Sequence, residues 1–155
     1  MGKIADRIAE LGIELPPPIP APTDHALLVR SGQLVFMSAQ GPLDAQRQAI
    51  YSGQVGKDLT EEEGIAAARL SALNTLVAME GELGSLDVIT QVVRLTGFVQ
   101  SAPGFERQPW VLNGASEVFT QIFGDERGAH ARSSVGVSAL ALGMACVIET
   151  VYEVA

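Results

Sequence analysis

Val88–Val99 is the segment that most constrains the fold, because it is apolar on both faces of a strand. Its β-branched residues predict a strand, whose successive side chains point to opposite faces. One face then carries Ile89, Gln91, Val93, Leu95 and Val99, and the other carries Val88, Thr90, Val92, Arg94, Thr96 and Phe98. Such a strand needs a cover on each side. In a chain of 155 residues with few helices, we expect another subunit to provide one of the two covers.

Residues 1–22 predict a short helix followed by an extended strap. Ile4, Ile8 and Leu11 recur at helical intervals, and Gly12 follows as a stop. The proline-rich run 16–22 excludes a helix or a central strand, and it favours an extended polyproline segment that straps the helix to the body. A proline-rich ligand for another domain is the alternative interpretation.

A hairpin and a less regular segment follow the strap. Two apolar runs, His25–Arg30 and Leu34–Ser38, flank the turn signal Ser31–Gln33 and predict paired strands. Gly41–Pro42 ends the second strand. The residues 49–53 predict a short strand or an extended arm.

Two amphipathic helices are predicted. Thr60 and Glu63 form a capping box at the start of the first, in which each side chain satisfies a free backbone N–H of the other residue. We expect this helix to end at Gly81 or Gly84. The second helix spans Val111–Ile122 and is closed by Gly124. The apolar stripe of the first helix consists of Ile65, Ala68, Ala72, Leu73, Leu76 and Met79.

The last two strands are predicted at Ala131–Leu140 and Ala145–Val154, and we expect them to pair as a hairpin through Leu142–Met144. The order of elements predicts an α+β fold, in which two helices cover one face of a mixed sheet. The chain is expected to be a single domain, with the helix and strap in 1–22 and the core in 23–155. The other face of the sheet stays open in one chain, and three or more copies would cover it.

Composition and charge narrow the partners. Hydrophobic residues make up 47% of the chain and charged residues 18%, which favours burial between subunits. A net charge of -8 argues against a nucleic acid or an anionic membrane as partner, because both attract clustered Lys and Arg. No apolar run is long enough to span a membrane. With one cysteine, Cys146, and no secretion signal at the N-terminus, we expect a cytoplasmic protein without an internal disulfide.

Arg132 is the most informative candidate for chemistry. The sequence shows no metal-ligand cluster, phosphate loop or serine nucleophile elbow, so we expect neither metal nor cofactor. An arginine that lies among small residues at the start of a strand needs an anionic partner. One interpretation is structural: Arg132 pairs with Glu149, on the neighbouring strand of the expected hairpin, or lies at a solvated strand end. The other leaves its guanidinium free to grip a small carboxylate, with Glu149 handling a water or a proton.

Five segments carry a pattern that is specific in its order and spacing: Phe36–Pro42, Val92–Val99, Leu112–Phe119, Ala131–Val137 and Val147–Glu149. Together they resemble the RidA/YjgF/YER057c/UK114 family, which often carries the label endoribonuclease L-PSP. The likeness covers roughly residues 22 to 155, and the N-terminal additions resemble the family's longer YjgF-like branch.

The resemblance implies a chorismate-mutase-like subunit in a homotrimer with a central β-barrel and a ligand cleft at each interface. It implies hydrolysis of reactive 2-imino or 2-enamino acids to 2-oxo acids and ammonia. By matching position, Arg132 would bind the carboxylate and Glu149 would hold the water. The cleft would also be lined by Ser133, by Ser134, where many members have Cys, and by Ser38, Ala39 and Gln40.

Two departures and two alternatives accompany this resemblance. The family's tyrosine near the first strand has no counterpart, and His130 replaces the usual proline before Ala131–Arg132. We expect His130 to be a solvated loop histidine, and a role near the imine is the alternative. In place of a deaminase, the same cleft would serve a non-catalytic carboxylate-binding or stress-response protein. The ribonuclease of the family label would have to overcome the charge of -8.

Overall fold

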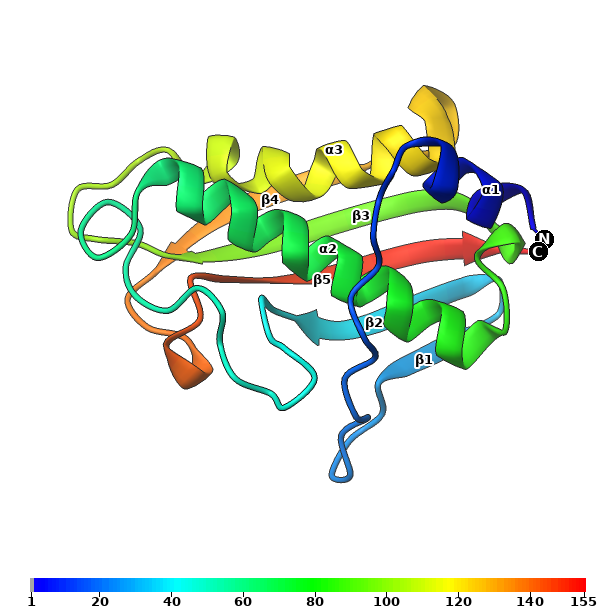
Figure 1. Cartoon of the computed structure of the whole chain (residues 1–155), viewed down its shortest axis with the longest axis horizontal. Helices are drawn as coiled ribbons and strands as arrows, with labels where there is room; N and C mark the ends of the chain where they lie inside the picture. The colour runs from blue at the N-terminus through cyan, green and yellow to red at the C-terminus, as the bar shows by residue number, and fades with distance from the viewer. Residues whose placement is uncertain (1) are drawn as a thin grey trace.

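Within residues 2–155, which the computed structural model describes, three helices and five strands build the chain (Figure 1). The five strands form one mixed sheet in the order β1-β2-β5-β3-β4. Every neighbouring pair is antiparallel except β3 and β4, which are parallel. The elements are α1 Lys3–Glu10, β1 Leu28–Ser31, β2 Leu34–Gln40, α2 Glu61–Leu83, β3 Ile89–Gln100, α3 Gln108–Arg127, β4 Ala131–Val137 and β5 Cys146–Val154.

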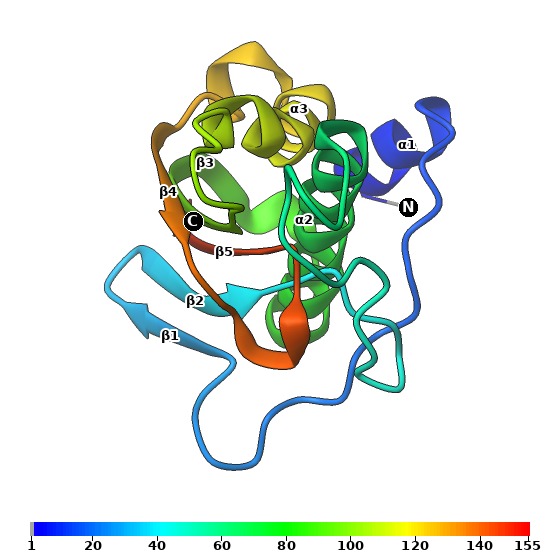
Figure 2. The same cartoon turned by 90° about the vertical axis from the view of Figure 1, so that its left-hand side faces the viewer.

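The predicted α+β layering is confirmed. Helices α2 and α3 lie side by side over one face of the sheet, and none of the helices in residues 2–155 covers the other face (Figure 2). Helix α2 begins with the predicted capping box, in which Glu63 N donates to Thr60 Oγ1 over 3.1 Å and Thr60 N to Glu63 Oε2 over 2.7 Å. It ends at Gly84 with φ +80°. Gly124, at φ +82°, interrupts α3 where the helix was expected to end, and the last turn continues to Arg127.

The predicted hairpin of the last two strands is wrong. Strand β3 lies between β4 and β5 and pairs with both. The cause is the unit β3-α3-β4: a helical crossover between two strands of one sheet favours parallel neighbours. The segment 138–145 then carries the chain past β3 to the opposite side, where β5 joins β2.

Two β-bulges correct the predicted faces of β3. The pairing with β5 shifts between Ile89 and Gln91, and again between Val92 and Arg94. Each bulge adds one residue to β3 and reverses the alternation of side chains. Val92 therefore lies fully buried on the helix-covered face together with Leu95, instead of sharing a face with Arg94.

The helix-free face of the sheet, called the open face below, is rich in exposed apolar side chains from three strands. Val29 is 56% exposed and Phe36, its partner across β1 and β2, is 46% exposed. Leu34 and Val135 add to this surface. The predicted second cover is therefore missing in a single chain, as the sequence indicated.

The N-terminal helix docks on the body, as predicted for a strapped helix. Ile4 and Ile8 are buried, and α1 packs against α3. The Asp87 carboxylate accepts hydrogen bonds from the backbone of Lys3 (3.0 Å) and Ile4 (2.8 Å), so it caps α1 from outside the helix. The proline-rich run 16–22 then crosses α2 without regular secondary structure (Figure 1).

The residues 49–53 form no regular strand but make two isolated bridges, from Ala49 to Leu43 and from Ser52 to Met144. Among residues 2–155, the helices are all too short or too polar to cross a membrane.

We predict that the single thiol is inert in the folded protein. Cys146 is fully buried, and burial raises the pKa of its thiol from 9.0 to about 12. At about pH 8 the thiolate fraction is then about 1,000-fold smaller than in the unfolded chain, and a disulfide reagent should react at least that much more slowly before than after unfolding. Absorbance of the released chromophore measures both rates. Comparable rates would contradict the burial of Cys146.

Candidate functional site

Arg132 lies near the start of β4, one of the two edge strands of the sheet, and its guanidinium points toward α3. Nη1 donates to Asn113 Oδ1 over 2.9 Å and to Ser116 Oγ over 3.0 Å. Nη2 donates to the carbonyl oxygen of Pro109 over 3.2 Å. Three neutral acceptors from one helix therefore fix the plane of the guanidinium.

Two glycines allow α3 to approach closely enough for these contacts. A Cβ on Gly97 of β3 would collide with the side chain of Leu112, and a Cβ on Gly114 would collide with the backbone of Ile65 on α2. The missing side chains thus seat α3 against both the sheet and its neighbouring helix. The two acceptor side chains of α3 lie three residues apart, so they face the same strand.

His130 continues the network, and the expectation of a solvated loop histidine is wrong. Its Nδ1 lies 2.7 Å from the carbonyl oxygen of Gly128, and its Nε2 lies 2.9 Å from Ser116 Oγ. Since a carbonyl only accepts, Nδ1 carries a proton, and in this tautomer Nε2 accepts the Ser116 hydroxyl. The ring is half-buried and meets Phe119 edge to face, with centroids 5.9 Å apart.

The positive charge of Arg132 has no anionic partner among the residues that the structure describes. Across residues 2–155, no carboxylate lies within 4.0 Å of the guanidinium. Partial burial lowers its pKa from the ordinary value, but an arginine stays protonated at physiological pH. The three contacts use both Nη1 protons and one Nη2 proton, which leaves Nε–H and one Nη2–H. A carboxylate that binds side-on to a guanidinium takes one proton from each of these two nitrogens.

Glu149 lies apart from Arg132. It is on β5, two strands from β4, and its exposed side chain alternates with buried Ile148 and Thr150. Glu149 therefore belongs to the open face, where it lines a hollow of about 290 Å³ with Arg94. The expected pairing of Arg132 and Glu149 on adjacent strands is wrong, because β3 separates them.

Ser133 and Ser134 point to different faces of β4. Ser133 accepts a hydrogen bond from Arg94 Nη2 over 2.7 Å on the open face. Ser134 follows in the alternation, so it shares the helix-covered face with Arg132. Only Ser134 is therefore placed to serve the same site as Arg132 within one chain.

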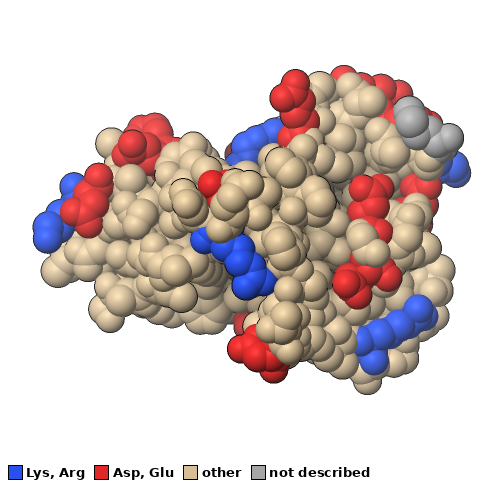
Figure 3. Space-filling view, turned by 60° about the horizontal axis from the view of Figure 1, so that its bottom comes forward, with Lys and Arg blue, Asp and Glu red and all other residues tan. Residues whose placement is uncertain are grey.

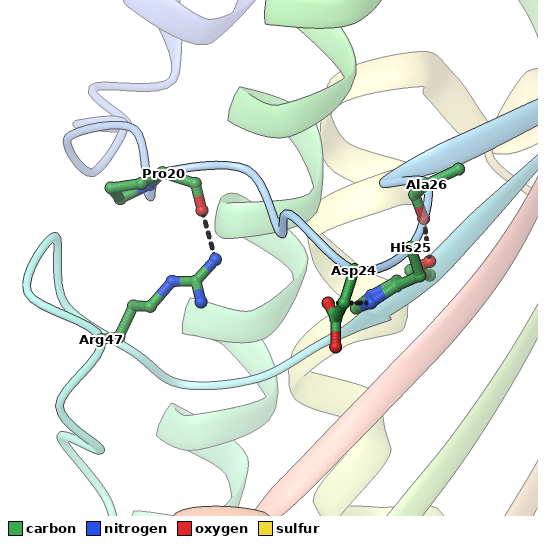
Figure 4. A network of polar contacts seen from close by, with 6 residues as sticks. Pro20, Asp24, His25, Ala26 and Arg47 are labelled. Carbon is green, nitrogen blue, oxygen red and sulfur yellow. Dashed lines mark hydrogen bonds and ion pairs between the residues drawn. The ribbon is translucent and has the colours of Figure 1, made fainter.

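The end of β2 carries Ser38, Ala39 and Gln40. Strands β5 and β3 separate β2 from β4 in the sheet. The three residues of β2 line a cavity of about 220 Å³ beneath the proline strap, together with His25 and Arg47. Arg47 Nη2 donates to the carbonyl oxygen of Pro20 over 2.6 Å and holds the strap in place (Figure 4). His25 Nδ1 lies 2.9 Å from Asp24 Oδ1, and this hydrogen bond lowers the pKa of the Asp24 carboxyl.

The predicted residues thus fall into three groups: Arg132 and Ser134 under α3, Ser133 and Glu149 on the open face, and Ser38, Ala39 and Gln40 under the strap. Sequence reasoning missed Asn113 and Ser116 as parts of the site. Their spacing on a predicted helix was visible, but nothing in the sequence indicated that this helix would cross over Arg132.

Metal-binding side chains and surface charges bear on which ligands the protein can hold. The part of the chain that the structure describes has no group of three or more His, Cys, Asp or Glu side chains placed to hold a metal ion. On the face shown in Figure 3, Lys and Arg are scattered singly among uncharged and acidic surface. This face therefore offers no basic patch for a phosphate backbone.

These features define the class of protein. It is an α+β subunit in which two helices cover one face of a mixed sheet and an arginine is held at the sheet edge. A family model described as "YjgF/chorismate mutase-like, putative endoribonuclease" matches residues 5–154. The chain belongs to this family, as its sequence motifs indicated.

Several relatives resemble the whole chain. Protein TCP17 of Trypanosoma cruzi is 40% identical over 152 residues, which cover 98% of this chain and 94% of TCP17. Atu1372 of Agrobacterium tumefaciens is 34% identical, with a TM-score of 0.86 over 97% of this chain and 91% of its own. A Shewanella oneidensis protein described as a putative endoribonuclease is 30% identical, with a TM-score of 0.91 over 99% and 100%. E. coli TdcF, solved with bound serine, shares the fold at 19% identity and a TM-score of 0.62, over 89% of this chain and 94% of its own.

Proposed function

We propose that this protein is an imine or enamine deaminase, which hydrolyses 2-imino or 2-enamino acids to 2-oxo acids and ammonia. The observation that carries the proposal is the state of Arg132: a guanidinium held rigidly by three neutral acceptors, with no carboxylate partner and with two donors left over. A fixed, uncompensated fork of this kind suits a small carboxylate bound side-on.

Hydrolysis of a bound imine requires few catalytic groups from the protein. The carbon of a protonated imine is already electrophilic, so a water adds to it and gives a carbinolamine. Transfer of a proton to the nitrogen then lets ammonia leave as the C=O bond forms. Orientation of the substrate and proton transfer to and from water supply the acceleration.

We place the site between protomers of a homotrimer. The Arg132 group lies on β4 and the Ser38–Gln40 group on β2, and two other strands separate β4 from β2 in the sheet. One chain therefore cannot bring both groups to one ligand. The apolar open face favours burial against further copies, which would bring β4 of one protomer toward β2 of the next. Glu149 would reach an Arg132 site only from a neighbouring protomer, because within a chain the two side chains lie on opposite faces.

A non-catalytic carboxylate-binding protein is the second candidate. It is favoured by the neutral surroundings of Arg132, where no acidic side chain lies in contact, and is consistent with the bound serine of TdcF. Calorimetric titration with an imine separates the two candidates, since a binder saturates and a deaminase consumes the imine during the titration. RNA cleavage that survives removal of contaminating ribonucleases and disappears in Arg132→Ala would favour the ribonuclease instead.

Replacement of Arg132 by alanine is expected to lower kcat/KM by at least about 100-fold, because it removes the charged half of a carboxylate contact. The substrate is a 2-imino acid generated in the assay by an amino-acid oxidase, and release of the 2-oxo acid is followed with time. Arg7→Ala on α1 is the matched control, with a guanidinium removed outside the site. Equal rates for Arg132→Ala and the wild type would remove Arg132 from the mechanism.

Mixed assemblies test the position of the site between protomers. Arg132→Ala removes one half, and Ala39→Trp fills the other half at an exposed position of β2. Each variant alone is expected to be inactive. Co-expressed in equal amounts, they should regain about a quarter of wild-type activity, because random assembly places an intact Arg132 beside an intact Ala39 at about one interface in four.

Co-expression of Arg132→Ala with Arg132→Gln is the control, which should regain nothing. If the pair with Ala39→Trp also regains nothing while its assemblies form normally, the two groups do not share a site. The mass of each assembly, measured by light scattering, checks the trimer itself.

A further inference from the structure

We propose that Ser116 and His130 form the proton shuttle of the Arg132 site. Ser116 Oγ would take the proton from the attacking water and pass its own proton to His130 Nε2. The inference rests on the proposed deaminase function, and it gives catalytic roles to two residues that the family resemblance did not assign.

The hydrogen-bond directions favour this shuttle. Ser116 Oγ accepts from Arg132 Nη1 over 3.0 Å, and its hydroxyl donates to His130 Nε2 over 2.9 Å. The carbonyl oxygen of Gly128, 2.7 Å from Nδ1, holds the ring in the tautomer whose Nε2 is free of a proton. A second lone pair on Ser116 Oγ stays available to a water.

Hydrolysis of an imine needs a proton-transferring group close to Arg132, which would hold the substrate carboxylate. Water that adds to a protonated imine must lose a proton, and the amino group that leaves must gain one. Glu149 of the same chain lies on the opposite face of the sheet. Among residues 2–155, the network that contacts Arg132 directly or through one hydroxyl contains one side chain of the kind that most often serves as a general acid or base, and that side chain is His130.

The steps balance. As the water oxygen bonds to the imine carbon and the C=N π electrons move to nitrogen, one water proton goes to Ser116 Oγ and the Ser116 proton goes to His130 Nε2. The imidazolium then returns this proton through Ser116 to the carbinolamine nitrogen. As the C–N bond breaks and the C=O bond forms, the carbinolamine hydroxyl gives its proton through Ser116 to His130. Ammonia leaves with the two protons of the protonated imine and the one that His130 returned, and the imidazolium then releases its proton to solvent. No electron is gained or lost overall.

The shuttle is distinguished from a purely structural network by replacing His130 with glutamine. The amide oxygen of the introduced glutamine can accept the Ser116 hydroxyl much as Nε2 does, but it cannot take up a proton. His130→Gln is therefore expected to lower kcat by about 100-fold or more. The Kd of the 2-oxo acid product, which reports the Arg132 anchor alone, should change by less than about 3-fold.

Thr120→Ala is the matched control: it removes a hydroxyl one turn further along α3 that bonds only backbone carbonyls of its own helix. Its kcat is expected to equal that of the wild type. An undiminished kcat in His130→Gln would overturn the shuttle while leaving the deaminase intact. A large loss in Glu149→Gln together with an unchanged His130→Gln would assign proton transfer to Glu149. Wild-type protein that turns over no imine would defeat the proposed function, and the shuttle with it.

A second measurement does not depend on turnover. Nitrogen-15 NMR of the two histidines in mildly alkaline solution should show His130 with a protonated Nδ1 and an unprotonated Nε2, and Ser116→Ala should shift the Nε2 signal. The opposite tautomer, or no response to Ser116→Ala, would overturn the shuttle whatever the enzyme assay gives.

Discussion

The candidate site depends on how the Arg132 guanidinium is held. A buried or half-buried arginine usually pairs with a carboxylate, because an unpaired charge loses hydration without compensation. Here the compensation comes from Asn113, Ser116 and the Pro109 carbonyl, which are dipoles without net charge. They satisfy the donors on one side of the guanidinium and leave its charge available. An anion from outside therefore meets a fixed cation and has no internal competitor to displace.

The same arrangement explains why α3 must lie so close to the sheet. The acceptors reach Arg132 because Gly97 and Gly114 let the helix approach both β3 and α2. The close packing at these two glycines thus determines where the side chains of α3 meet Arg132 at the edge of the sheet. The sheet's open face adds a second constraint, since its exposed apolar side chains call for further copies of the chain. Both constraints support the proposal that a neighbouring protomer completes the site at Arg132.

Most of the architecture was predictable because it depends on local signals. The capping box at Thr60 and the tight turn at Gly32 are properties of short segments, and both were confirmed. The bulges in β3 were not predictable, because one added residue leaves no mark in a run of β-branched side chains. The false hairpin had a related cause: adjacency in sequence suggested pairing, whereas the long crossover through α3 placed β4 parallel to β3.

The site was predictable only in part, and the reason is physical. The motif around Arg132 identified the cation, but its three hydrogen-bond partners come from α3, and these contacts depend on tertiary packing. His130 illustrates the difference. In the sequence it is an isolated histidine before a strand, and in the structure both ring nitrogens are bound and its tautomer is fixed by a backbone carbonyl. These two contacts direct Nε2 at the Ser116 hydroxyl, which also accepts from Arg132 Nη1. In the proposed reaction, the residues that hold the carboxylate anchor would therefore also align the path by which the attacking water releases its proton.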